Sequence, residues 1–345
     1  MMTINRNTLV PRGLAVLACM IGMAWADVAV AQQELETVRY ASWGPKLVDQ
    51  ADIFVAEDLG YFRDEGIRLE WITAQGGGDA LRHVIAGNAD FAATDPVLLL
   101  FSLERGVKVK AFYAVTPNNQ YTVLARKSEG VRSIADLRGK RIAVTSMASG
   151  SRYNVMTILN SNRLKETDVT LVATGLNFAG PIEQGQVDAA GTWDIMNWDL
   201  MNRVLPSKIV DDLIVFRAAD YLNVPTNVYA TTEDILGKKR DVLTKFVRAH
   251  RKATEYMHVH PQEAATIAAK YAVTGATDAD RNLAVVKLRM AMELDDEAKR
   301  KGFGWMSEAV LNRFAEAYHD WGLVKEKHEF YEFATNVIVQ SIDGK

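Results

Sequence analysis

The segment from Ser146 to Arg152 brings together groups that bind acceptor-rich ligands. It combines several hydroxyls, the backbone amides of a predicted helix start and one guanidinium in a single short loop. Such groups donate hydrogen bonds to a sulfonate, a carboxylate or a similar group. In a purely structural alternative, Ser149 caps the helix and Arg152 lies in solvent. The segment therefore predicts either an oxyanion site or an ordinary helix start.

Two tryptophans and two aspartates stand where predicted strands end, at Trp43, Asp95 and Trp193-Asp194. Two indoles could clamp an apolar or planar solute. They could also hold a cationic amine, with Asp194 or Asp95 as the counter-charge. Packing in the core is the alternative for each tryptophan.

A run of glycines at Gly76-Gly77-Gly78 opens another predicted helix. Its backbone can approach a ligand closely, and the free amides of the helix could receive an anion. The run is too short for a phosphate loop, and no Lys-Ser or Lys-Thr pair follows it, so nucleotide hydrolysis is discounted. A plain turn is the alternative.

Short apolar strands alternate with amphipathic helices along the chain. This βαβα order predicts an α/β fold whose mainly parallel sheets are covered by helices. A second such unit begins near residue 141, and the length favours two domains. Strands are expected at 38–43, 67–71, 91–94, 107–115, 141–145, 170–174, 188–192 and 228–231, with helices near 47–59, 81–85, 151–163, 242–253 and 306–321.

A ligand of an open α/β sheet sits beyond the carboxyl ends of the strands. The loops that follow the predicted strands therefore supply the candidate binding residues. These residues are Trp43, Gly77, Thr94, Asp95, Asn118, Ser149, Ser151, Arg152, Trp193 and Asp194.

Composition and charge exclude several other functions. The 40 basic and 43 acidic side chains give a net charge of -3, which offers no positive field for nucleic acid. The single cysteine, Cys19, can form neither an intramolecular disulfide nor a Cys-based zinc site. No nucleophile is paired with a base, so neither a catalytic residue nor a cofactor is expected.

A metal site is rejected at His258-Val259-His260 and at Asp295-Asp296-Glu297. Metal ligands need more convergent partners than the two histidines offer. The acidic cluster precedes basic residues and is typical of a solvated helix face.

The first 31 residues have the order of a secretory signal. Arg6 and Arg12 precede the apolar run Gly13 to Trp25, and Ala29-Val30-Ala31 offers small residues for cleavage before Gln32. The run is shorter than a membrane span. Lipid attachment at Cys19 is an alternative, but the apolar stretch before that cysteine is short. The sequence thus predicts a soluble periplasmic protein.

Several short sequence segments, taken together, resemble those of the solute-binding proteins of ABC importers. Ala56 to Phe62, Glu65-Gly66-Ile67 and Ala86 to Phe91 carry the first part of this resemblance, and Ile134 to Val144 and Gly185 to Ala190 carry the second. The second part is similar to the group that binds alkanesulfonates, taurine, nitrate and the pyrimidine precursor of thiamine.

The resemblance implies a two-lobed type II periplasmic-binding fold with the ligand between the lobes. It assigns residues 36–122 and 226–345 to lobe one and residues 123–225 to lobe two. It also supports Ser149, Ser151 and Arg152 as ligand donors, because the matching loop of the family commonly contacts the ligand.

The resemblance implies capture of a small organic solute, sulfonate-like or taurine-like, and its delivery by a monomer to an inner-membrane permease. The alternatives are a pyrimidine or an aromatic acid as the ligand, or a periplasmic sensor. An enzyme is not expected, because the related pyrimidine synthase uses a Cys-rich motif and the chain after the signal has no cysteine.

Overall fold

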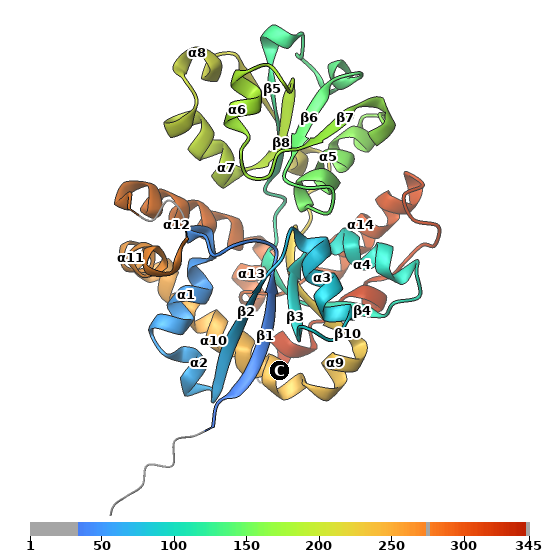
Figure 1. Cartoon of the computed structure of the whole chain (residues 1–345). Coiled ribbons are helices and arrows are strands. Elements are labelled where there is room, and N and C mark those ends of the chain that lie inside the picture. The colour runs from blue at the N-terminus through green and yellow to red at the C-terminus, as the bar shows by residue number, and fades with distance from the viewer. Residues whose placement is uncertain (1–33, 274–276, 343–345) are drawn as a thin grey trace, which may run out of the picture. The chain divides into compact units, whose positions relative to one another are not determined.

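A computed structural model describes residues 34–273 and 277–342, and its strands form two separate five-stranded sheets (Figure 1). The signal segment predicted for residues 1–31, with its cleavage site and Cys19, lies outside the described residues. The first sheet has the order β2 (Ile67–Thr73), β1 (Glu36–Ser42), β3 (Phe91–Thr94), β10 (Asn227–Thr232), β4 (Val109–Thr116). The second has the order β7 (Thr170–Ala173), β6 (Arg141–Val144), β8 (Ala189–Trp193), β5 (Tyr121–Arg126), β9 (Leu213–Arg217).

Both sheets are mainly parallel, and each contains one strand that runs the other way. In the first sheet β10 pairs antiparallel with both β3 and β4. In the second sheet β5 pairs antiparallel with both β8 and β9. The remaining pairs are parallel, as the βαβα order predicted.

Helices flank both sheets. Those of the first half of the chain are α1 (Ala51–Asp58), α2 (Tyr61–Asp64), α3 (Gly77–Ile85), α4 (Pro96–Leu103), α5 (Gly150–Ser161) and α6 (Ala179–Glu183). They are followed by α7 (Asp194–Asp199), α8 (Ser207–Val210), α9 (Glu233–Lys238), α10 (Arg240–Val259) and α11 (Pro261–Tyr271). The last are α12 (Ala279–Glu293), α13 (Asp296–Lys301), α14 (Glu308–Asp320), α15 (Phe330–Phe333) and α16 (Val337–Ile342). No helix in the described part of the chain is both long and apolar enough to cross a membrane.

The first sheet carries large side chains on one face and small ones on the other. Successive residues of a strand point to opposite faces of the sheet, so the side chains of Tyr40 and Ala41 lie on opposite faces. Tyr40 stacks on Phe91 with 5.0 Å between ring centroids, and Phe91 meets Phe246 of α10 at 4.4 Å. The alanines of the other face pack with Ala80 and Val84 of α3. Because alanine leaves the backbone uncovered, α3 can lie close to the strands.

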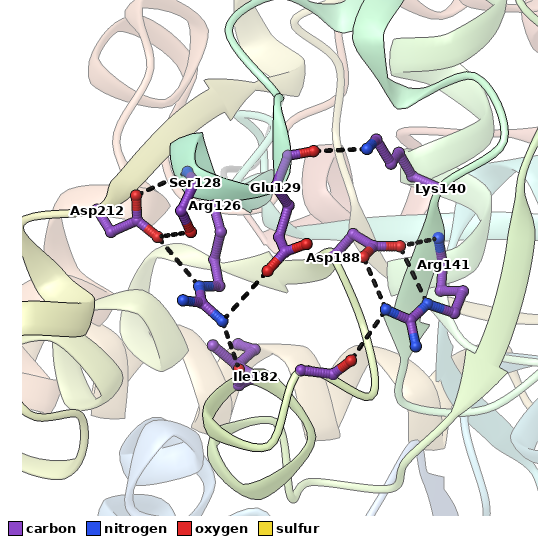
Figure 2. A network of polar contacts seen from close by, with 9 residues as sticks. Arg126, Ser128, Glu129, Lys140, Arg141, Ile182, Asp188 and Asp212 are labelled. Atoms are coloured by element: carbon purple, nitrogen blue, oxygen red, sulfur yellow. Dashed lines mark hydrogen bonds and ion pairs between the residues drawn. The ribbon is translucent and has the colours of Figure 1, made fainter.

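A buried aspartate starts a central strand in each sheet and holds an arginine of the neighbouring strand. Asp90 accepts hydrogen bonds from the backbone and side chain of Arg39, at 2.8 and 2.9 Å. Asp188 does the same for Arg141, at 2.7 and 2.8 Å, as Figure 2 shows. These contacts therefore fix the register of the two neighbouring strands where the central strand of each sheet begins.

The chain passes between the sheets twice, at residues 117–120 and 218–226. The two segments are hydrogen-bonded to each other: the Asn119 amide donates to Asn223 Oδ1 at 2.8 Å, and the Thr226 hydroxyl donates to the Asn118 carbonyl at 3.3 Å. Strand β5 begins at Tyr121, so the second sheet starts just before the predicted lobe boundary of 122 and 123. The exact lobe boundaries stay a prediction.

The expected strands lie within a few residues of the observed ones, and 91–94 coincides with β3. The sequence pattern does not predict β5 and β9. The antiparallel β5 lies between β8 and β9, is nearly continuously apolar, and is not separated from the preceding β4 by a helix. The βαβα pattern therefore gives no signal for it.

Candidate functional site

A cavity opens at the carboxyl ends of parallel strands of both sheets. The space between its walls that no atom fills is about 640 Å³, open solvent included. Trp43, Thr94, Thr145 and Trp193 lie at the ends of β1, β3, β6 and β8. The other residues that line it are Asp49, Gly76, Gly77, Ala93, Asp95, Gln120, Tyr121, Ser149, Gly150, Ser151, Ile195, Thr226, Asn227 and Arg289.

Two indoles form one part of the wall. The rings of Trp43 and Trp193 meet edge to face, with 6.2 Å between centroids and 76° between planes. Trp193 also packs edge to face on Phe178 and is only 8% exposed, whereas Trp43 is half-buried. Trp193 therefore belongs to both the wall and the core, and Trp43 has the freer aromatic surface for a ligand.

The glycine run brings two loops together. Gly76 has φ +105°, and a Cβ on it would lie 2.9 Å from the Ala148 carbonyl oxygen. The Gly78 amide donates to that same oxygen at 3.1 Å. Gly77 lines the cavity, and its carbonyl accepts the Thr94 hydroxyl at 2.9 Å. The absence of side chains thus permits contact between the loop before α3 and the loop before α5.

The loop before α5 turns its serines toward the cavity and its arginine away. The hydroxyls of Ser149 and Ser151 lie 2.8 Å apart, and Ser151 Oγ accepts the Thr145 amide at 3.0 Å. Arg152 Nε and Nη2 instead donate to the two carboxylate oxygens of Glu166, at 3.1 and 3.0 Å. Arg152 does not line the cavity. Its positive charge is already paired.

Asp95 is a buried carboxyl that faces the cavity. It is 5% exposed, and the side-chain hydrogen bond it accepts is a long one, 3.4 Å, from Asn154 Nδ2 to Oδ1. Burial raises the pKa of Asp95 to about 8, because the carboxylate is desolvated and the Asn154 contact offsets little of that cost. Its Oδ2 and the Tyr121 hydroxyl lie 2.5 and 2.2 Å from the position that a Cβ on Gly150 would take. Only glycine therefore fits at position 150.

A second acid, Asp49, and an arginine, Arg289, also line the cavity, although neither follows a predicted strand. Burial raises the pKa of Asp49 to about 6, although Arg289 partly offsets this shift. Asp49 Oδ1 is buried without a hydrogen-bond partner among the described residues. Arg289 of α12 is 6% exposed, and donates to Asp52 Oδ2 and Glu293 Oε1 at 2.7 Å each.

The network behind Arg289 is buried in the first-sheet core. His250 Nε2 lies 3.0 Å from both Asp52 Oδ2 and the Tyr229 hydroxyl. Burial raises the pKa of Asp52, but Arg289 and His250 outweigh it and hold that pKa well below its usual range. Asp52 is therefore ionised, and it forms an ion pair with Arg289.

Asp194 and Asn118, two of the candidate residues, lie outside the cavity lining. Both line a separate groove with Trp198, and Arg217 Nη1 donates to Asp194 Oδ1 at 2.7 Å. Asn118 Nδ2 donates to the Leu294 carbonyl at 3.1 Å. The structure thus brings seven sequence candidates together, which are Trp43, Gly77, Thr94, Asp95, Ser149, Ser151 and Trp193.

The residues discounted as metal ligands make other contacts. His258 Nε2 lies 3.0 Å from Glu293 Oε2, and Asp295 caps α13 by accepting the Ala298 amide at 2.6 Å. Within residues 34–273 and 277–342, no group of three or more His, Cys, Asp or Glu side chains is arranged to hold a metal ion.

Comparison with known proteins places the chain among known sequences. A model of the family described as NMT1/THI5 like matches residues 48–264. A riboflavin-binding protein of Chloroflexus aurantiacus is 23% identical over 314 residues, which are 90% of this chain and 88% of that protein. A 4-amino-5-hydroxymethyl-2-methylpyrimidine phosphate synthase of Saccharomyces cerevisiae is 22% identical over 223 residues, 61% of this chain. The match covers 64% of the yeast synthase, less than two thirds of its length.

A solved structure confirms the fold class. The alkanesulfonate-binding protein of Xanthomonas axonopodis pv. citri, bound to MOPS, matches with a TM-score of 0.65 and 16% identity. The match covers 88% of this chain and 99% of that protein. At this identity the likeness shows the two-lobed fold of periplasmic binding proteins and nothing finer.

Proposed function

Because the chain belongs to the NMT1/THI5-like family, we propose that it is the ligand-binding component of an ABC importer. It captures a small organic solute in the cavity lined by Trp43 and Asp95 and delivers it to a permease in the inner membrane. The observation that carries this proposal is the cavity itself. It is lined from both sheets and from the two segments that join them.

The walls of the cavity support a flat solute. Indole faces stack on planar groups, and the exposed part of Trp43 is available for such stacking. The first turns of α3 and α5, at Gly77 and Gly150, offer backbone amides for acceptor atoms of the ligand. Arg152, which the sequence analysis offered to a sulfonate, is bound to Glu166 outside the cavity. We therefore favour a pyrimidine-like or other heteroaromatic solute over a sulfonate.

A synthase activity is the second candidate, because yeast pyrimidine phosphate synthases are among the relatives. The side chains support binding better than catalysis. Among the described residues that line the cavity there is no histidine, and the Ser149 and Ser151 hydroxyls lie against each other rather than against a base. The only cysteine of the sequence is Cys19.

The proposed location is the periplasm, after cleavage between Ala31 and Gln32. Intact mass of the exported protein tests this location, since a lipid on Cys19 or a retained residue 1–31 segment would contradict it. The protein is proposed to act as a monomer. A receptor that reads the loaded protein, in place of a permease, is the sensor alternative.

The test begins with a thermal-shift screen of sulfonates, aromatic acids and N-heterocycles, because a ligand that binds only the native state raises its stability. Cells that lack the gene should then take up the radiolabelled solute more slowly. Wild-type protein should restore uptake, whereas Trp43→Ala should not. The matched control is Asp234→Asn, an exposed carboxylate paired with Lys238 on α9, which should restore uptake fully. Unchanged uptake in the deletion strain would contradict the importer function.

A further inference from the structure

The cavity holds two carboxyl groups that the protein leaves without a positive partner of their own. The structures and relatives that resemble this chain include a sulfonate binder, so an anionic ligand is the first expectation from likeness. The charges of this cavity point the other way. The inference drawn from them rests on the proposed function, because it concerns the solute of the same site.

Asp95 faces uncharged groups on each element packed against it. Asn154 of α5 contacts its Oδ1, and the Tyr121 hydroxyl of β5 lies near its Oδ2 at Gly150. The titratable groups on which Asp95 acts are phenols, since its carboxyl contributes to the raised pKa values of Tyr121, Tyr153 and Tyr318. Its raised pKa has burial as the first cause, and no described Lys, Arg or His acts on it. A buried carboxyl without a cation is costly when it is ionised.

Arg289 does not supply that missing charge. Its guanidinium already donates to Asp52 and Glu293, and both of these side chains are buried. Arg289 thus stands among three carboxyl groups, since Asp49 lines the same cavity with an oxygen that no described residue hydrogen-bonds. Arg281, which also acts on Asp49, is paired with Asp199. An oxyanion placed here would meet the Asp49 carboxylate at short range, and like charges repel strongly in a desolvated site. It would also oppose ionisation of Asp95, whereas a cation favours it.

The aromatic wall suits a cation as well as a flat ring. An indole face attracts a cation within about 6 Å of its centroid, and tryptophan is the best of the aromatic side chains for this contact. Trp43 and Trp193 lie at the same cavity as Asp95. A cationic nitrogen on a planar group can therefore meet an indole and a carboxylate together.

We infer that the solute is an organic cation, with a protonated nitrogen on a flat group that pairs with Asp95 and lies against Trp43. Asp49 supplies a second acceptor for N–H donors of the same group. The amides at the starts of α3 and α5 hold acceptor atoms elsewhere on the ligand. The specificity of this chain thus differs from that of the sulfonate binder that shares its fold.

Binding of a cation releases a proton. Asp95 with a pKa of about 8 is mostly protonated at pH 7, and pairing with a cation favours the carboxylate. The proton leaves the Asp95 carboxyl for the buffer, and the ligand keeps its own. Calorimetry in two buffers of different ionisation enthalpy measures this release.

The experiment uses sets of flat compounds that share one size and differ in charge. The first set is benzamidinium, benzamide and benzoate, and the second is the matching naphthalene set. Thermal shift on the mature protein at pH 7.5 ranks the members, and calorimetry gives their affinities. The cationic members should bind at least about tenfold more tightly than the anionic ones, with a proton released.

Variants then assign the selectivity to one residue. Asp95→Asn keeps the size of the side chain and should remove at least about tenfold of the cation affinity together with the proton release. Asp234→Asn, far from the cavity lining, should keep both. Tighter binding of the anionic members would overturn the inference and leave the importer function standing. Equal binding of neutral and cationic members, or no binding in any set, would overturn it too, while the broader solute screen decides the proposed function.

Discussion

Strand β3 is four residues long, and an aspartate stands at each end of it with opposite surroundings. Asp90, before the strand, binds Arg39 and Lys239 at 2.9 Å each. Burial raises the pKa of Asp90, but these hydrogen bonds outweigh it and hold that pKa below its usual range. Asp95, after the strand, is also buried, but no Lys, Arg or His of the described residues acts on it, and burial raises its pKa to about 8. The carboxylate of Asp90 is thus paired with cations of the protein, whereas the carboxyl of Asp95 has no cationic partner among the described residues.

In the second sheet the aspartate before β8 is paired like Asp90, but the aspartate after β8, unlike Asp95, is paired as well. Arg141 and Asp188 stand one residue before the paired Ile142 and Ala189, as Arg39 and Asp90 stand before Tyr40 and Phe91. Figure 2 shows Asp188 with both the backbone and the guanidinium of Arg141. At the other end of β8, Asp194 meets Arg217.

This difference separates two uses of a buried charge. At the strand starts the aspartate joins neighbouring strands, so its partner comes from the protein. At the end of β3, which lines the cavity, no described cation pairs with Asp95. Changes at the two ends of β3 should therefore affect different measurable properties, stability at one and binding at the other.

The largest effect is expected at Asp90. Asp90→Ala removes the buried acceptor of Arg39 and Lys239, whose side chains are 35% and 37% exposed and so stay hydrated. We expect a loss of about 3 kcal/mol, mainly from the lost hydrogen bonds to the charged carboxylate. Urea denaturation of the mature protein measures the free energy of unfolding. Asp188→Ala should give a similar though smaller loss, because Arg141 is more exposed than Arg39. A loss under about 1 kcal/mol in both variants would show that the clamps do not stabilise the sheets.

At the other end of β3, replacement of Asp95 should increase the free energy of unfolding at high pH, whereas replacement of Asp90 decreases it. Because the native pKa of Asp95 lies above its unfolded value, its contribution to stability is present below about pH 4 and is lost as pH rises to about 8. Asp95→Asn has no such loss. Its stability relative to wild type should rise by at least about 1 kcal/mol between pH 5 and pH 9. Parallel pH profiles for the two proteins would contradict the raised pKa.

Trp193 belongs to both the core and the cavity wall, so its substitution should affect stability and binding together. The sequence predicts that Trp193→Ala or Asp194→Ala weakens binding by about tenfold or more, and that stability changes much less than affinity. The core packing of Trp193 against Phe178 adds an expected loss of about 3 kcal/mol in stability. Trp193→Phe keeps most of that packing and should lose less stability than affinity. Calorimetric titration and urea denaturation of both variants separate the two contributions, and unchanged affinity in Trp193→Ala would remove this wall from the site.

The smallest effects are expected at the candidate residues outside the cavity. Arg152→Ala breaks the ion pair with Glu166, and Asp194→Ala breaks the pair with Arg217. Exposed pairs contribute at most about 1 kcal/mol to stability. Affinity should change by less than about twofold in each variant. For Asp194→Ala this expectation replaces the tenfold loss that the sequence alone predicts. A tenfold loss in Arg152→Ala would return the loop arginine, and an oxyanion ligand, to the site.

The rule that ligands lie beyond strand ends predicted half of this cavity. It holds for Trp43, Asp95 and Ser149, since each follows a parallel strand. It misses Tyr121 and Asn227, because β5 and β10 are antiparallel and begin at the edge where the others end. The sequence showed neither strand's direction.

Residues from outside the strand ends were further out of reach. Arg289 sits in α12 between Leu288 and Met290, so nothing in its surroundings distinguishes it from a solvated helix residue. Its importance comes from Asp52 and Glu293, and only the folded chain brings Asp52 to it. Arg152 and Ser151 are adjacent in sequence, yet the first turn of α5 sends one away from the cavity and the other into its wall.

A crystal structure of the mature protein with the tightest binder of the charge-matched sets would show where the solute binds and which charge meets Asp95. We predict the ligand in the cavity, with a cationic nitrogen within hydrogen-bond distance of Asp95 and a ring against Trp43. A ligand bound in the groove of Asp194 and Arg217, or one whose anionic group meets the loop of Ser149 with Asp95 untouched, would contradict it.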